Sequence, residues 1–165
     1  MLWFIGLGIS GISELSNSTL EVIKNAEIVY LESFTSPISE TEKKQLEDIS
    51  GGEFKTAKRW LVEDGNEILE NAKNRETVLI SYGDPYIATT HLELKTRAIR
   101  DSIETKTIHS SSIVSSLIGE VGLHYYKVGK VLTIMNDPKS MITPYNTIFE
   151  NLLGKTHSVI LLEYN

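Results

Sequence analysis

The chain of 165 residues is 41% apolar and 23% charged, which is typical of a soluble globular protein, and it is long enough to bury roughly 70% of its unfolded surface. Its net charge of −6 argues against a nucleic-acid partner, which needs clustered lysine and arginine, and the absence of cysteine excludes disulfides, thiolate zinc sites and cysteine nucleophiles. No apolar run approaches the ~20 residues of a membrane-spanning helix, so we expect a cytosolic (cytoplasmic) protein without a membrane partner.

The N-terminal strand Leu2–Ile5 runs directly into a glycine-rich turn, Gly6–Gly11, with the G-x-G-x-x-G spacing of dinucleotide-binding proteins. A second strand ends at Glu32, near the usual place of a ribose-binding acid, which leaves a nicotinamide-dependent oxidoreductase as one hypothesis. However, residues 12–17 separate the glycines from a helix expected to begin at Ser18, so its dipole would lie too far from a pyrophosphate. We therefore interpret the glycines as a tight turn beside a ligand or another loop.

Strands and helices are expected to alternate along the chain, which predicts an α/β fold with a parallel sheet. The expected strands are residues 2–5, 27–31, 53–56, 77–80, 104–108, 131–135 and 158–162, and the clearest helices are 18–26, 40–48, 64–73, 92–100 and 145–153. The two prolines of 136–144 predict a linker between an N-terminal domain, 1–135, and the start of a second α/β domain, 145–165. Because an apolar strand near a chain end needs neighbours, we expect this second domain to be truncated.

The central segment, Ser81–His91, joins a buried strand to an amphipathic helix. In parallel sheets such loops lie at the carboxyl ends of the strands, where ligands bind. Gly83 permits close backbone approach, Asp84 can accept hydrogen bonds and Pro85 fixes the turn. The alternative is an ordinary turn in which Thr89 or Thr90 caps the helix.

Three consecutive serines, Ser110–Ser112, follow His109 at the end of a later strand. Helix capping accounts for one or two serines at such a position, but not easily for all of them. A second polar loop at the carboxyl end of a strand is what a binding site beside the Asp84 loop would need.

Several common kinds of site have no matching pattern in the sequence. The four histidines show neither H-x-x-x-H nor H-E-x-x-H spacing, so we expect no metal. A G-x-S-x-G hydrolase turn and a P-loop are also absent from the sequence.

Four segments together resemble one family, the diphthine synthases. They are Phe4–Gly8, Gly83–His91, Ile108–Ile113 and Gly122–Lys130. Diphthine synthases are the diphthamide-biosynthesis members of the tetrapyrrole-methylase-like methyltransferases, which depend on S-adenosylmethionine. The G-D-P step is shared across that superfamily, whereas its continuation to A-T-T-H resembles diphthine synthases in particular.

The resemblance implies a two-domain α/β enzyme, usually a homodimer, that binds S-adenosyl-L-methionine between its domains and releases S-adenosyl-L-homocysteine. It implies repeated methylation of the amino group of a 3-amino-3-carboxypropyl arm on a histidine of elongation factor 2, which forms diphthine. Carried over by motif, the cofactor-binding residues would be Ile9, Asp84, Ile87, Ser112, Ile113 and Leu162. The resemblance assigns no catalytic residue.

Two further alternatives stay open beside the nicotinamide enzyme. One is a sibling methylase of a corrin or porphyrin precursor, against which the A-T-T-H continuation argues. The other is a dimerising fragment without activity, which would follow from the expected truncation.

Overall fold

The first part of the chain folds around five parallel strands in a computed structural model, which describes residues 1–163. The sheet has the order β3-β2-β4-β1-β5. Its strands are β1 (Leu2–Gly6), β2 (Ile28–Glu32), β3 (Glu53–Ala57), β4 (Thr77–Ser81) and β5 (Thr105–Ile108). The central strands β2 and β4 are buried along their whole length, as expected of apolar, β-branched runs covered on both faces. The predicted α/β fold with a parallel sheet is confirmed.

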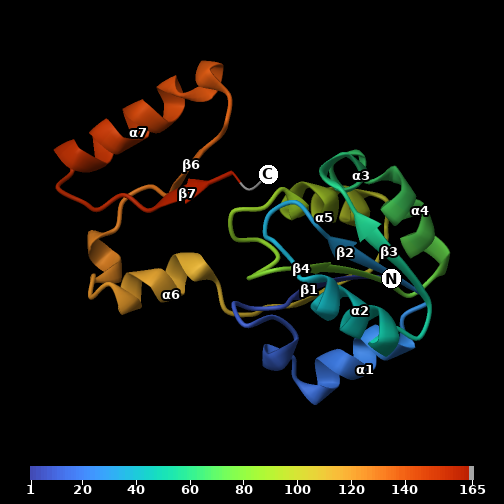
Figure 1. The fold of residues 1–165 in the computed structure, drawn as a ribbon. Helices are drawn as coiled ribbons and strands as arrows, with labels where there is room; N and C mark the ends of the chain where they lie inside the picture. The colour runs from blue at the N-terminus through green and yellow to red at the C-terminus, as the bar shows by residue number, and fades with distance from the viewer. Residues whose placement is uncertain (164–165) are drawn as a thin grey trace. The chain divides into compact units, whose positions relative to one another are not determined.

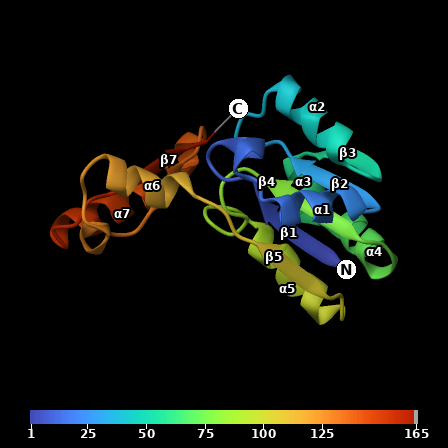
Figure 2. The ribbon, with the colours of Figure 1, turned by 90° about the horizontal axis from the view of Figure 1, so that it is seen from below.

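Helices cover both faces of this sheet (Figures 1 and 2). On one face, α1 (Asn17–Asn25) and α2 (Glu40–Ile49) pack through Ile23 and Leu46 against the sheet. On the other face lie the remaining helices of this part, α3 (Arg59–Asp64), α4 (Asn66–Asn74) and α5 (His91–Arg100). Two apolar cores result, one on each side of the sheet.

The helix caps differ in part from those that the sequence suggests. Ser39 caps α2 by accepting a hydrogen bond from the amide of Glu42, at 3.2 Å. The start expected at Ser18 is wrong, because Ser16 caps α1 by accepting from the amide of Thr19. Thr90 precedes α5 but makes no capping hydrogen bond with its side chain, so the interpretation of the central loop as a threonine-capped turn is not supported.

The chain divides into two compact units, and the second begins at Ile113. It contains α6 (Ile113–Glu120), α7 (Ile142–Leu153) and a parallel pair of short strands, β6 (Leu132–Ile134) and β7 (Ile160–Leu162). The division lies earlier than the linker predicted at 136–144, because β6 pairs with β7 and not with the five-stranded sheet. The domain limits 1–135 and 145–165 stay predictions.

The described helices are all short. Within residues 1–163, none combines the length and the apolar character that crossing a membrane requires.

Candidate active site

The site predicted at the carboxyl ends of the strands coincides with a switch in the connections of the sheet. Strands β1 and β4 are neighbours. The chain leaves β1 towards α1 on one face, and it leaves β4 towards α5 on the opposite face (Figure 1). Two loops therefore diverge beyond this edge, which is where open α/β sheets bind ligands.

The two diverging loops are joined by their backbones. The amide of Gly8 donates to the carbonyl of Gly83 at 3.1 Å, and the amide of Gly83 donates to the carbonyl of Gly8 at 3.0 Å. Both glycines have positive φ, +72° and +65°, which suits residues without a Cβ. At Gly6 a Cβ would collide with the carbonyl oxygen of Gly83. The N-terminal glycines thus serve loop pairing, and α1 begins only at Asn17, too late for a pyrophosphate-binding turn.

Asp84 connects the central loop to the serine loop that follows β5. Its buried carboxylate accepts at Oδ1 from the amide of Tyr86, 3.0 Å away. At Oδ2 it accepts from Nδ1 of His109 at 2.7 Å and from the amide of Ser110 at 3.4 Å. The predicted proximity of the Asp84 loop and the serine loop is therefore present in the fold.

Ser111 connects the serine loop to the glycine turn. Its hydroxyl accepts from the amide of Ile9 at 2.9 Å and donates to Oε2 of Glu14 at 2.5 Å. The other oxygen of Glu14 accepts from the amide of Ser10 at 2.8 Å. These hydrogen bonds lower the pKa of the Glu14 carboxyl. The bond from Ser111 contributes most, and the bond from Ser10 comes second.

Replacement of Ser111 by alanine is expected to raise the pKa of Glu14 back towards its ordinary value, because the carboxylate loses its strongest donor. A ¹³C NMR titration of the Glu14 side chain measures this change. Ser13→Ala is the matched control, since the Ser13 hydroxyl donates to the carbonyl of Ser10 and not to Glu14. An unchanged pKa in the Ser111 variant would contradict the assigned contact.

A buried pair, Glu32 and His91, lies below the same edge. Glu32 accepts from the amides of Phe34 and Thr35, both at 2.7 Å. His91 is bonded through Nδ1 to the carbonyl of Pro85 at 3.0 Å, which leaves its Nε2 3.8 Å from Glu32. Burial is the main cause of a lowered pKa of His91, and the Glu32 carboxylate opposes it. Glu32 therefore stabilises the turn after β2 and holds no ribose in this arrangement.

The residues expected to bind cofactor fall into two groups. Ile9 and Ile87 are exposed to 40% and 42%, whereas Asp84 and Ser112 are buried, and all four belong to loops at the carboxyl edge of the five-stranded sheet. The other two lie in the second unit, where Ile113 begins α6 and Leu162 ends β7. Their cofactor-binding roles stay predictions.

Sequence reasoning missed two features of this edge. One is Glu14, and the other is the hydrogen bond between His109 and Asp84. The position of His109 directly after a strand and before the serines was a usable signal. No sequence signal marks Glu14. It belongs to a short 3₁₀ segment, Gly11–Glu14, and its contact with Ser111 depends on how the chain folds.

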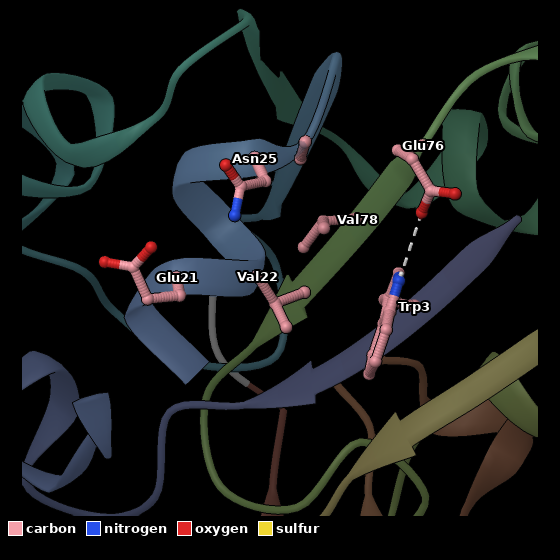
Figure 3. Close-up of a pocket in the computed structure, with 7 residues that line it drawn as sticks. Trp3, Glu21, Val22, Asn25, Glu76 and Val78 are labelled. Atoms are coloured by element: carbon pink, nitrogen blue, oxygen red, sulfur yellow. Dashed lines mark hydrogen bonds between the residues drawn. The ribbon is translucent and has the colours of Figure 1, made fainter. Parts of the chain in front are cut away.

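A separate groove lies between α1 and the sheet, lined by Trp3, Val22 and Val78 among others (Figure 3). The indole nitrogen of Trp3 donates to Glu76 at 3.3 Å. Glu76 immediately precedes β4, so this groove lies towards the amino ends of the strands and away from the loops above. In residues 1–163, no three histidine or acidic side chains gather closely enough to hold a metal ion.

Comparison with known proteins identifies the family of the chain. The family model described as tetrapyrrole (corrin/porphyrin) methylases matches residues 1–165. The chain is 39% identical over 166 residues to a diphthine synthase of Methanospirillum hungatei, with 99% of this chain and 66% of the relative covered. It is 36% identical over 166 residues to a diphthine methyl ester synthase of Saccharomyces cerevisiae, with 99% and 55% covered.

Among solved structures, a crystal structure of diphthine synthase superposes with a TM-score of 0.87 at 31% identity, over 99% of this chain and 64% of that one. The chain thus spans between 55% and 66% of the length of these relatives. The resemblance inferred from the sequence is confirmed, and the chain belongs to the tetrapyrrole methylase family, with diphthine synthases among its relatives.

Proposed function

We propose that the protein is a cytoplasmic methyltransferase of diphthamide biosynthesis, active as a homodimer. It transfers methyl groups from S-adenosylmethionine to the amino group of 3-amino-3-carboxypropyl-histidine on elongation factor 2 and so forms diphthine. The observation that carries this proposal is the 39% identity to a diphthine synthase over nearly the whole chain.

The loops at the carboxyl edge suit S-adenosylmethionine chemically. Ile9 and Ile87 expose apolar side chains that can cover an adenine ring. A Cβ built at Gly83 would find only the Ser111 carbonyl oxygen, at 3.8 Å, so space is open beside the joined loops. The hydroxyl of Ser81 at the end of β4 is buried without a hydrogen-bond partner. When bound, the cofactor supplies an activated methyl group, and the protein has to bind and align the reactants.

Asp84 has a supporting role in this proposal. Both of its oxygens already accept hydrogen bonds from the protein, so the carboxylate fixes the loop that carries Ile87 and links it to the serine loop. Cofactor affinity then depends on Asp84 through the shape of these loops.

Calorimetric titration of the 165-residue polypeptide with S-adenosylhomocysteine tests the cofactor assignment. Saturable binding is expected, and Asp84→Ala should weaken it at least about tenfold, because the loops lose their common acceptor. Circular dichroism verifies that the variant is folded. NADH is the control ligand, and binding of NADH in place of S-adenosylhomocysteine would contradict the proposal.

The acceptor is tested with elongation factor 2 that carries the 3-amino-3-carboxypropyl intermediate, with a porphyrin precursor as the competing acceptor. Methyl incorporation into elongation factor 2 that survives mild alkali indicates N-methylation, whereas label released by alkali indicates a methyl ester. Transfer to the porphyrin precursor alone would favour the sibling methylase. A folded dimer without transfer to either acceptor would favour the inactive fragment.

A further inference from the structure

His109 forms a dyad with Asp84 at the carboxyl edge of the sheet. The imidazole is bonded through Nδ1 to Asp84 Oδ2 at 2.7 Å, and the side chain of His109 is 66% exposed while that of Asp84 is 7% exposed. A carboxylate accepts hydrogen bonds, so Nδ1 carries the proton. In the neutral imidazole the lone pair is then on Nε2, the nitrogen on the far side of the ring from Asp84.

The ring of His109 is held from a second side by Tyr86. The two rings meet edge to face with centroids 5.7 Å apart. The hydroxyl of Tyr86 is within 2.7 Å of the hydroxyl of Thr107 on β5, and Nζ of Lys95 lies 4.8 Å from the centre of the Tyr86 ring. Asp84 and Tyr86 thus both contact the imidazole, and Lys95 contacts Tyr86.

We propose that His109 is the base that removes the proton from the acceptor amine, and that Asp84 is the positioning residue that sets its tautomer. The inference rests on the proposed function. In each round, Nε2 takes a proton from the acceptor ammonium. The freed nitrogen lone pair bonds to the methyl carbon, the carbon–sulfur bond breaks, and its electron pair stays on sulfur as S-adenosylhomocysteine. The exposed imidazolium then releases its proton to solvent.

The other ionisable groups of this edge are less suited to the task. The pKa of Glu14 is lowered by the hydrogen bonds from Ser111 and Ser10, which makes it a weaker base. His91 is fully buried and cannot reach a ligand. Both oxygens of Asp84 are already bonded within the protein. His109 combines an exposed imidazole with a hydrogen bond from Nδ1 to Asp84, which leaves Nε2 on the outer side of the ring.

The test compares His109→Asn with the wild-type protein and with His124→Asn, a matched substitution at an exposed histidine outside the five-stranded unit. Asparagine can still donate to Asp84 but lacks the outer ring nitrogen. We expect the kcat of His109→Asn for methyl transfer to elongation factor 2 to be about 100-fold below that of the wild type at pH 7, because a general base usually contributes a factor of about this size. The loss should shrink towards pH 9, where α-amino groups, with pKa values near 8, are already deprotonated. S-adenosylhomocysteine affinity should stay within about twofold.

A second measurement needs no turnover. Two-dimensional ¹H–¹⁵N NMR of the imidazoles should show His109 as the Nδ1–H tautomer in the wild type and as the Nε2–H tautomer in Asp84→Asn, where the amide can donate to Nδ1. If the wild type and His109→Asn transfer methyl groups equally well at every pH, His109 is not the base, and the proposed function is unaffected. A wild-type Nε2–H tautomer overturns the dyad. A wild type that transfers no methyl group to elongation factor 2 overturns the proposed function.

Discussion

Replacement of Gly6 by alanine is expected to lower the free energy of unfolding of the N-terminal unit by about 2–3 kcal/mol, in the upper range for an overpacked interior site. The added Cβ would collide with the carbonyl oxygen of Gly83, and it would lie 3.0 Å from Pro85 Cδ and 3.1 Å from Ser110 Cβ. That carbonyl cannot retreat without giving up its hydrogen bond from Gly8. The same change should therefore abolish binding of S-adenosylhomocysteine. Urea denaturation and calorimetry measure the two effects.

Gly119→Ala is the matched control, since a Cβ built at Gly119 in α6 meets nothing within 4 Å. In a helix this substitution is expected to leave stability unchanged or to raise it by about 0.5–1 kcal/mol. If Gly6→Ala proved as stable as the wild type and bound ligand normally, the close apposition of the β1 and β4 loops would be wrong.

The stability of the protein is expected to fall as the pH drops below about 6.5, because of His91. Burial lowers the pKa of the folded-state imidazole, although the Glu32 carboxylate and the Pro85 carbonyl act in the opposite direction. The unfolded chain therefore takes up a proton first as the pH falls. The contribution of His91 is complete above pH 6.5 and declines below it until the folded-state pKa is reached. Urea denaturation between pH 8 and pH 5 measures the slope.

His91→Leu removes the titrating group and should flatten this slope. At pH 7.5 the variant is expected to be about 1 kcal/mol less stable, because the carbonyl of Pro85 loses one of its two hydrogen-bond donors and keeps only the hydroxyl of Thr89. His124→Asn, at an exposed position, serves as the control and should retain the wild-type slope. If the free energy of unfolding of His91→Leu depended on pH as steeply as that of the wild type, groups other than His91 would cause the loss of stability at low pH.

The sequence was sufficient for the parallel α/β fold and for the proximity of the Asp84 loop and the serine loop. Apolar, β-branched runs such as 77–80 mark buried strands, and a polar loop after each strand marks the carboxyl edge. The serines following His109 could therefore be placed beside the Asp84 loop, as the hydrogen bonds of Asp84 now show. The motifs of these loops also indicated the correct family.

The partners within the site were not predictable, because they depend on how loops approach one another in space. The position of Glu32 at the end of the second strand resembled that of a ribose-binding acid. In the structure its carboxylate instead accepts hydrogen bonds from the amides of Phe34 and Thr35. The two compact units of the structure meet at residues 112 and 113, a position that no feature of the sequence marks. The apolar pattern of a strand such as 132–134 is the same whether the strand joins the five-stranded sheet or pairs with β7, as it does here.

The reciprocal hydrogen bonds between Gly8 and Gly83 also bear on how the protein folds. They join loops that are far apart in the chain, and they can form only after β1 and β4 have aligned side by side. Contacts of such long sequence separation carry a large loop-closure cost and form slowly. The carboxyl-edge site should thus be among the last parts of the N-terminal unit to assemble, and a nascent chain acquires it only once the serine loop after β5 has been synthesised.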